Sequence, residues 1–343
     1  MATWSGILAE LNEYIKAGKP PSFDAIRRKY LVAAHKHTGR NIILYATKFT
    51  QPGGDVPPGL ITIVDEDLQG FMEVVHGLKG EKLDLILHSP GGSPTAAESI
   101  VAYLRSKFTD IRVIVPQLAM SAATMIACAA DRIVMGKHSF LGPIDTQFNL
   151  PSPLGARMVP CQAILDQFEL AKRECADPTK LGGWMPILPQ YGPDLLIQCQ
   201  NALDLSSDLV EDWLKSYMFA GMRGGAKRAK DVSTWLSNHA NFKSHNRHLS
   251  RDTLASKGLV IDHLEDDQKE QDLFLSIFHA STHTLTGTQA VKIIENHLGK
   301  AFIKMQAIPI SGTPVVPVVQ PADEPKPKKK RKQQSKKKKK TSR

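Results

Sequence analysis

Residues 83–92 read LDLILHSPGG, and residues 111–123 read IRVIVPQLAMSAA. In each stretch an apolar run of strand length leads into a turn. The first turn carries two glycines, and the second opens a run of small residues at Ser121. Glycines let the backbone turn sharply and bring its N–H groups close to a ligand. The sequence therefore predicts a serine and a set of backbone donors at the ends of successive strands.

Strand-like and helix-like segments alternate on both sides of these two stretches. Residues 41–46 and 132–135 have the apolar pattern of strands, whereas residues 65–78 and 95–108 carry apolar side chains at helical spacing. Such alternation implies crossover connections and a mostly parallel sheet. Near-continuous apolar strands fit a sheet that is covered on both faces. We therefore predict an α/β fold.

The chain is predicted to divide into four parts: N-terminal helices at 1–40, a central domain of alternating strands and helices at 41–218, a helical C-terminal extension at 219–308 and a Pro/Lys-rich tail at 309–343. Within the extension we expect helices at 268–279 and 287–299. The tail has too few apolar residues to bury a core, so we expect it to be disordered.

Composition places the chain among globular proteins, with 343 residues of which 42% are hydrophobic and 23% charged. The apolar run at 118–130 is shorter than the roughly 20 residues that a membrane-spanning helix needs, so we expect no transmembrane segment. Residues 1–10 lack the features of a secretory signal. We expect a cytoplasmic protein, with peripheral membrane association as an alternative and a nuclear location only in a eukaryote.

The net charge of +10 comes from the end of the chain. Residues 324–343 hold twelve Lys or Arg and one Glu, a net of +11, which leaves −1 for the preceding 323 residues. Such basic runs bind phosphates and anionic lipid without sequence specificity. We therefore expect residues 326–343 to contact nucleic acid or anionic lipid, with a merely solubilising tail as the alternative.

Ser121 needs an adjacent base and oxyanion donors to act as a nucleophile, because a serine hydroxyl reacts poorly at neutral pH. If Ser121 begins a helix, the N–H of Ala122 points into the site and can form an oxyanion hole with the N–H of Gly91 or Gly92. The alternative is that Ser121 only caps a helix and the glycines only form a turn. Their pairing on successive βα units favours a site, because ligands bind at the carboxyl ends of parallel strands.

Four motifs carry a resemblance to a known family: LHSPGG at 87–92, AMSAA at 119–123, DRIVM at 131–135 and LGPID at 141–145. Over about residues 40–175 the chain resembles the Clp protease/crotonase superfamily, and within it the serine dehydrogenase proteinase (SDH-type) family, close to signal peptide peptidase A. The resemblance implies a Clp/crotonase-like fold, Ser121 as nucleophile and the donors Gly91 or Gly92 and Ala122. It also implies a homo-oligomer, and no metal or organic cofactor.

Within the superfamily that the chain resembles, the general base is a histidine in one branch and a lysine in another. Clp protease has a histidine about 25 residues beyond its serine as part of a triad, but residues 142–145 here read GPID. In the signal peptide peptidase A branch the base is a lysine, and Lys172 lies 51 residues after Ser121. The expected dyad is therefore Ser121–Lys172. Lys172 follows Phe168 by four residues and is expected to point inward, where burial would lower its pKa; a solvated lysine is the alternative.

Two histidines are further candidates for the general base. His88 and His138 are fallback bases, and Asp145 could hold the base or bind a substrate amine. Three more histidines, at 239, 245 and 248, do not have zinc-site spacing, and a flexible, solvated loop is the favoured interpretation.

The function predicted from these features is a serine peptidase that hydrolyses peptide bonds in a peptide or protein substrate. One alternative is a crotonase-like acyl-CoA enzyme, in which paired backbone donors polarise a thioester. The other is a non-catalytic scaffold that binds nucleic acid or an anionic membrane through its basic tail.

Overall fold

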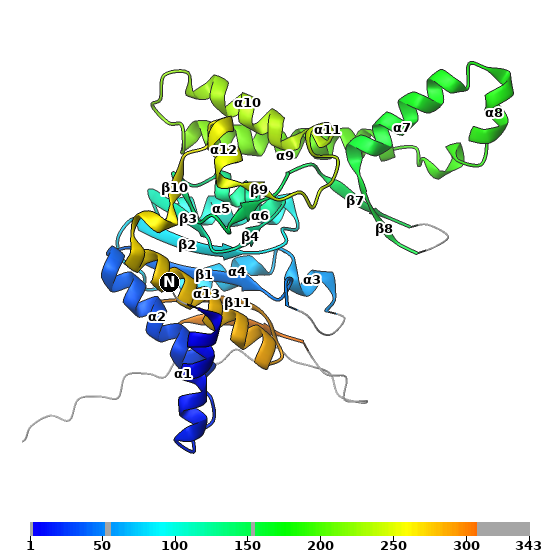
Figure 1. Cartoon of the computed structure of the whole chain (residues 1–343). Coiled ribbons are helices and arrows are strands. Elements are labelled where there is room, and N and C mark those ends of the chain that lie inside the picture. The colour runs from blue at the N-terminus through cyan, green and yellow to red at the C-terminus, as the bar shows by residue number, and fades with distance from the viewer. Residues whose placement is uncertain (1–2, 52–55, 152–154, 307–343) are drawn as a thin grey trace, which may run out of the picture.

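A computed structural model describes residues 3–51, 56–151 and 155–306; the predicted tail at 309–343 lies outside the described residues. Its centre is a seven-stranded sheet in the order β10-β5-β3-β2-β1-β11-β12 (Figure 1). The strands are β1 (Asn41–Thr47), β2 (Lys82–His88), β3 (Asp110–Val115), β5 (Arg132–Met135), β10 (Ile261–His263), β11 (Ala290–Asn296) and β12 (Ala301–Met305).

The five strands from β10 to β1 run parallel, and β11 and β12 add an antiparallel pair at one edge. Every residue of β1 is buried, as the near-continuous apolar pattern of this strand requires in a sheet covered on both faces. The predicted α/β fold with a mostly parallel sheet is confirmed.

Helices cover both faces of the sheet. One face carries α4 (Asp67–Val75), α5 (Pro94–Arg105), α6 (Ala122–Cys128), α9 (Leu195–Ser216), α10 (Gly225–Ser237) and α12 (Arg251–Lys257). The other face carries α2 (Phe23–Thr38) and α13 (Gln268–Gly287), with α1 (Trp4–Lys16) packed outside them. The predicted inward face of α5 is buried, and Ser93 caps this helix by accepting a hydrogen bond from the N–H of Ala96.

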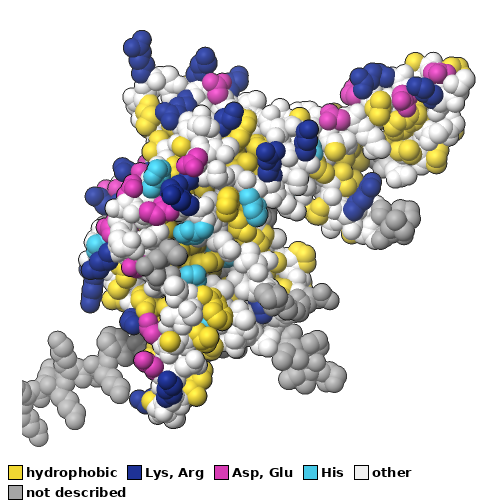
Figure 2. All heavy atoms as spheres, viewed as in Figure 1, with side chains coloured by type: hydrophobic (Ala, Val, Ile, Leu, Met, Phe, Trp, Pro, Cys, Tyr) yellow, Lys and Arg dark blue, Asp and Glu magenta, His cyan; other side chains and the backbone are white. Residues whose placement is uncertain are grey.

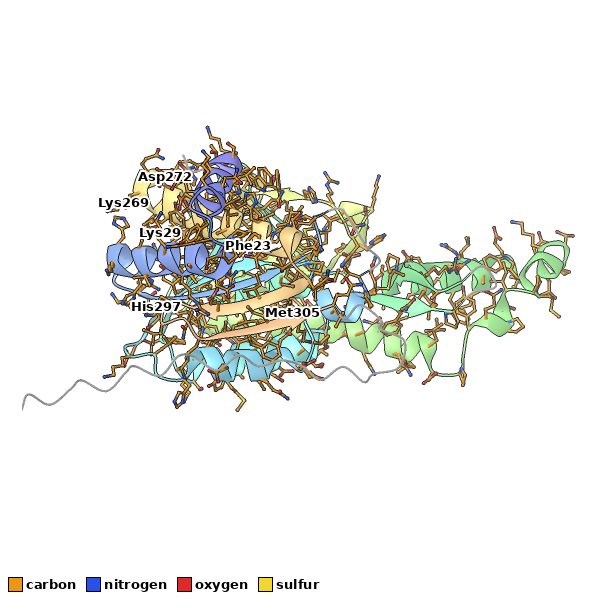
Figure 3. All side chains as sticks on the ribbon, turned by 90° about the horizontal axis from the view of Figure 1, so that it is seen from below. Phe23, Lys29, Lys269, Asp272, His297 and Met305 are labelled. Atoms are coloured by element: carbon orange, nitrogen blue, oxygen red, sulfur yellow. The ribbon has the colours of Figure 1, made fainter. Side chains whose placement is uncertain are left out.

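The C-terminal part of the chain contributes strands as well as helices to the body. The helix predicted at 287–299 is wrong, because residues 290–296 form β11, which is buried throughout between β1 and β12. In Figure 3, β11 and β12 lie side by side, with His297 just after β11 and Met305 at the end of β12. A short apolar run bounded by polar residues does not distinguish a strand from a helix by its pattern alone.

Residues 147–190 and the start of α9 form an arm that stands away from the sheet (Figures 1 and 3). The arm contains β7 (Gln147–Leu150), β8 (Arg157–Pro160), α7 (Cys161–Glu174), α8 (Pro178–Trp184) and a 3-10 turn, η1 (Leu188–Gln190). It has a small core of its own, centred on Cys161, Ile164, Cys199 and Leu203.

Shorter elements complete the described chain: α3 (Pro58–Ile61), α11 (His239–Phe242), η2 (Leu264–Asp266), β4 (Leu118–Ala119), β6 (Phe140–Leu141) and β9 (Leu249–Ser250). Strands β4, β6 and β9 form a separate small sheet. None of the described helices combines the length and the apolar character that crossing a membrane requires.

Candidate active site

The small sheet joins the glycine loop to the strand that precedes Ser121. The N–H of Ser89 donates to the carbonyl of Leu118 at 3.1 Å, and the N–H of Met120 donates to the carbonyl of Ser89 at 2.9 Å. Ser89 begins the loop that follows β2, and Met120 lies between β4 and Ser121. The two turns predicted from the sequence are therefore attached to one another.

Ser121 occupies a conformation that a helix cap does not need. Its φ is +52° and its ψ is −121°, whereas an ordinary N-cap residue has extended backbone. Its side chain makes no capping hydrogen bond, and its hydroxyl has no partner among the described residues. Positive φ in a non-glycine residue costs on the order of 1–3 kcal/mol and concentrates at functional sites. The capping role is therefore not the one that Ser121 performs here.

Gly91 lies directly against Ser121. A methyl group at Gly91 would stand 2.6 Å from the Cβ of Ser121, 2.5 Å from the carbonyl oxygen of Met120 and 2.9 Å from the nitrogen of Ala122. Gly91 also has a φ of +92°, which side-chain-bearing residues rarely adopt. Only glycine satisfies both requirements at this position.

Two backbone donors beside Ser121 are free. Within the described part of the chain, the N–H groups of Gly92 and Ala122 donate no hydrogen bond, whereas the N–H of Gly91 donates to the Oγ of Ser89 at 3.2 Å. Ala122 is the first residue of α6, so its N–H belongs to the positive end of a helix. Of the two glycine donors considered from the sequence, Gly92 is the unoccupied one.

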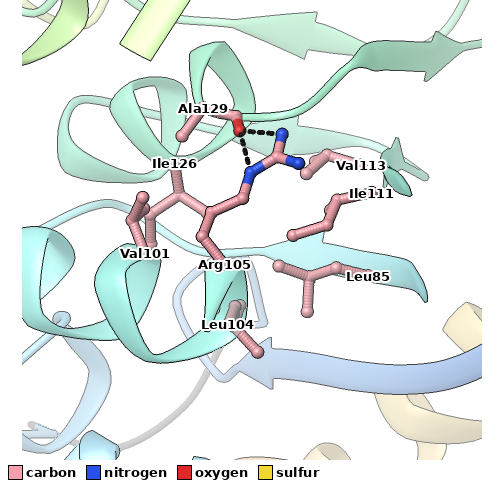
Figure 4. Close-up of a pocket in the computed structure, with 8 residues that line it drawn as sticks. All are labelled: Leu85, Val101, Leu104, Arg105, Ile111, Val113, Ile126 and Ala129. Carbon is pink, nitrogen blue, oxygen red and sulfur yellow. Dashed lines mark hydrogen bonds between the residues drawn. The ribbon is translucent and has the colours of Figure 1, made fainter. Parts of the chain in front are cut away.

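Helix α6 is anchored at both ends. The Oγ of Thr124 donates to the carbonyl of Ala119 at 2.8 Å and accepts from the N–H of Gly142 at 3.0 Å, which joins α6 to the small sheet. At the other end, the guanidinium of Arg105 on α5 donates to the carbonyl of Ala129, as the dashed lines in Figure 4 show. These contacts fix the helix that carries Ala122.

Asp145 holds two histidines, although the sequence pattern favoured a flexible, solvated loop for them. Its side chain is 1% exposed, and its two oxygens lie 2.7 Å from Nδ1 of His239 and 2.8 Å from Nδ1 of His245. The side chains of the two histidines are 19% and 17% exposed. The prediction of a solvated loop is therefore wrong for His239 and His245, whereas His248 is exposed as that prediction expected. The sequence carries no local signal for this cluster, because Asp145 is separated from the histidines by 94 and 100 residues.

The small sheet connects the segment that leads to Asp145 with the segment that leads to Ser121. In the β4–β6 pair Ala119 lies beside Leu141, and a methyl group at Gly142 would stand 3.4 Å from the Cα of Met120. Asp145 follows three residues beyond Gly142. At about 3.3 Å per residue, the Cα of Asp145 lies within roughly 10 Å of the Cα of Gly142. Figure 2 shows several histidine side chains near the middle of the face in view.

The structure does not bring Lys172 to Ser121. Lys172 lies on α7 in the arm, its side chain is 58% exposed, and its Nζ donates to Glu169 at 2.9 Å. The inward orientation expected from the spacing to Phe168 is thus not the observed one. Because a lysine base needs burial to lose its proton near neutral pH, a single chain in this conformation does not supply one at Lys172.

Among the described residues, neither His88 nor His138 is hydrogen-bonded to Ser121. His88 is buried beside the rings of Phe49 and Phe278, the latter from α13 on the opposite face of the sheet from α6. Burial lowers the pKa of His88 to about 3, so this histidine is neutral. His138 follows β5, and its Nε2 is buried with no hydrogen-bond partner in the described structure. In residues 3–51, 56–151 and 155–306 no three His, Cys, Asp or Glu side chains are grouped to hold a metal ion.

Comparison with known proteins matches the part of the chain that contains Gly91, Gly92, Ser121 and Asp145. Residues 61–170 match the model of the ClpP-like SDH-type serine proteinase family. The chain is also 41% identical over 93 residues to Uncharacterized protein MJ0137 of Methanocaldococcus jannaschii, and 35% identical over 97 residues to Uncharacterized protein MJ1495 of the same organism. These segments cover 26% and 28% of this chain and 32% and 30% of the two relatives. The chain thus spans about a third of the length of the curated relatives that it matches.

Proposed function

We propose that this protein is a serine peptidase in which Ser121 attacks the carbonyl carbon of a peptide bond. The contact between Gly91 and Ser121 is the observation that carries the proposal, because it joins a strained, unpartnered serine to a loop with a free N–H. The match of residues 61–170 to a serine proteinase family supports the same chemistry.

In the proposed reaction the Oγ of Ser121 forms a bond to the carbonyl carbon and gives up its proton to a base. The N–H groups of Gly92 and Ala122 stabilise the negative charge that develops on the carbonyl oxygen. The amine of the substrate then leaves with a proton from the same base, and water hydrolyses the acyl-enzyme. No metal or organic cofactor takes part in these steps.

Lys172 remains the base predicted from the family resemblance. It could take the proton of Ser121 in one of two ways. Either the arm moves and brings the Nζ of Lys172 from Glu169 to Ser121, or the Lys172 of a second copy of the chain enters the site. The exposed ion pair with Glu169 is worth little and would not oppose such a move strongly.

The pair of histidines on Asp145 is the base that we favour within one chain. A carboxylate that accepts from Nδ1 of a histidine directs Nε2 away from itself, which is the arrangement by which a triad prepares its base. Asp145 does this for His239 and His245 together, and both side chains keep some exposure. Access from Ser121 to an Nε2 could be direct or through one water.

Labelling with a fluorophosphonate probe tests the nucleophile apart from the choice of substrate. Wild type should react and Ser121→Ala should not; an equal reaction in both would contradict the proposal. Labelling of Ser121 also separates this function from the crotonase-type alternative, in which no serine attacks. Hydrolysis of casein and of labelled peptides by the same two proteins extends the test to peptide bonds.

Matched variants identify the base. If Lys172 acts, Lys172→Ala should lose roughly 100-fold or more in labelling rate, whereas Lys180→Ala, another exposed arm lysine paired with a glutamate, should not. If the histidine pair acts, the double variant His239→Gln/His245→Gln should show that loss instead. His248→Gln is its control, because His248 stacks on Phe140 in the same segment without reaching Asp145.

We also propose that the arm mediates a homo-oligomer. It exposes large apolar side chains that a monomer leaves in water, and among its described residues those at least half exposed are Met158, Met185 and Ile197. Light scattering on wild type and on Met185→Glu/Ile197→Glu should show a smaller species for the variant; the same mass for both would contradict this proposal.

The basic tail is proposed to contact nucleic acid or anionic lipid. Deleting residues 324–343 removes a net charge of +11. The truncated protein should lose salt-sensitive binding to an oligonucleotide or to phosphatidylserine vesicles while its fluorophosphonate labelling is unchanged.

A further inference from the structure

Lys292 on β11 and Asp67 at the start of α4 form a buried ion pair. Both side chains are 0% exposed, and the Nζ of Lys292 lies 2.6 Å and 2.7 Å from the two carboxylate oxygens of Asp67. The hydroxyl of Tyr45 donates to the same carboxylate at 2.8 Å. Such pairs contribute little net stability, because desolvation of both charges offsets their attraction.

Both partners of this pair also hold the backbone on either side of Ile63. The Nζ of Lys292 donates to the carbonyl of Thr62 at 2.8 Å, and the N–H of Val64 donates to Asp67 at 3.0 Å. Ile63 lies between these two anchored residues. Its peptide groups are therefore fixed from both directions by one ion pair.

Ile63 in turn forms backbone hydrogen bonds with the residues on either side of Gly92. Its N–H donates to the carbonyl of Gly91 at 2.8 Å, and its carbonyl accepts from the N–H of Ser93 at 2.9 Å. A methyl group at Gly92 would stand 2.5 Å from the nitrogen and 2.4 Å from the carbonyl oxygen of Ile63. The loop thus lies in backbone contact with Ile63 on one side and, through Gly91, with Ser121 on the other.

We propose that Lys292 and Asp67 are positioning residues that hold the N–H of Gly92 toward the carbonyl oxygen of the substrate. They act through Ile63 and touch neither the substrate nor Ser121. The oxyanion role of Gly92 rests on the proposed peptidase function, whereas the fixing of the loop does not depend on that function.

The surroundings of Lys292 keep its ammonium group charged at neutral pH. Burial lowers the pKa of Lys292 to about 8, and the attraction of Asp67 opposes that shift. Lys304 and Glu66 also face the pair: the Nζ of Lys304 lies 2.8 Å from Glu66 and 3.8 Å from Asp67. A lysine that remains ionised beside a carboxylate is a poor base, so Lys292 is suited to holding the loop and not to accepting the proton of Ser121.

The test compares two double variants, each of which neutralises a buried ion pair that has one partner on β11. Lys292→Met alone would leave Asp67 buried and unpaired, so the folding-safe variant is Lys292→Met/Asp67→Asn, which keeps an acceptor for Tyr45 and Val64. Its matched control is Arg27→Met/Glu295→Gln. Arg27 and Glu295 form an equally buried pair between α2 and β11, but neither side chain is hydrogen-bonded to residues 62–64.

Two measurements are made on the folded full chain. Amide hydrogen exchange at Ile63 and Ser93, whose N–H groups join the loop to Ile63, should be roughly tenfold faster in Lys292→Met/Asp67→Asn than in wild type, and unchanged in the control. The maximal rate constant of fluorophosphonate labelling should fall roughly 10- to 100-fold in the first variant only, at an unchanged half-saturating probe concentration.

Equal exchange at Ile63 and Ser93 in the two double variants would overturn the proposal, and so would a normal maximal labelling rate in Lys292→Met/Asp67→Asn. If wild type is not labelled at Ser121, the peptidase function fails instead. The exchange measurement then still decides whether the ion pair fixes the loop.

Discussion

Gly91 and Ser121 lie in direct contact, and a methyl group at Gly91 would stand 2.6 Å from the Cβ of Ser121. This contact is what converts two separate turns into one site. Gly91→Ala should therefore abolish fluorophosphonate labelling and lower the free energy of unfolding by roughly 2–4 kcal/mol, because it adds both a clash with backbone atoms and strain at positive φ. Urea denaturation and the labelling rate measure the two effects.

Gly77→Ala supplies the control for backbone strain alone. Gly77 has a φ of +88°, close to the +92° of Gly91, but a methyl group there would meet no atom within 4 Å. This variant should lose only about 1 kcal/mol and keep full labelling. If the two variants behaved alike, the close approach of Gly91 to Ser121 would not be the cause.

The strain at Ser121 predicts which of two inactive variants, Ser121→Gly or Ser121→Ala, is the more stable. Ser121→Gly relieves the positive φ, whereas Ser121→Ala retains it. We expect Ser121→Gly to be the more stable variant by about 1 kcal/mol, although glycine also raises the entropy of the unfolded chain. Thermal and urea unfolding of both would show it. A more stable Ser121→Ala would mean that the backbone at this position is not strained.

Thr124 should contribute measurably to the stability of the site, since its hydroxyl joins β4, α6 and β6. Thr124→Val keeps the shape of the side chain but leaves the carbonyl of Ala119 and the N–H of Gly142 without this partner. We expect a loss of about 1–3 kcal/mol, measured by urea denaturation. Thr124→Ser, which keeps the hydroxyl, should recover most of it; no recovery would assign the loss to packing.

His88 should make the fold sensitive to acid. Burial lowers its pKa from 6.5 to about 3, so between these values the unfolded chain binds a proton that the folded protein does not. Stability therefore falls as the pH drops from about 6.5 toward 3, and is unaffected by this group above pH 7. Between pH 7 and pH 4, the free energy of unfolding of His88→Gln should fall by roughly 3 kcal/mol less than that of wild type.

The control for this pH effect is His76→Gln, since His76 is exposed at the end of α4. It should lose stability in acid as wild type does. Urea unfolding at pH 7 and at pH 4 gives the required free energies. Equal acid sensitivity in wild type and His88→Gln would show that His88 does not stay neutral in the folded protein.

The pattern of the sequence was sufficient for the strands that end at the site. Apolar runs of strand length at 83–88 and 111–115, each followed by glycine or small residues, predicted parallel strands with a loop and a helix at their carboxyl ends. These features are local, because strand pattern, turn chemistry and helix start depend on residues a few positions apart. The prediction was wrong at residues 290–296, where a short apolar run was assigned to a helix and forms the buried strand β11.

By itself, the sequence determined the α/β alternation and the candidate nucleophile with its neighbouring donors. Only the tertiary structure decided what surrounds them: that Lys172 faces solvent in the arm, that Asp145 holds His239 and His245, and that Lys292 reaches Asp67. The physical reason is that these contacts join residues far apart along the chain. Their partners are selected by the pairing of strands and the packing of layers, and no periodicity along the sequence records which distant side chains will meet.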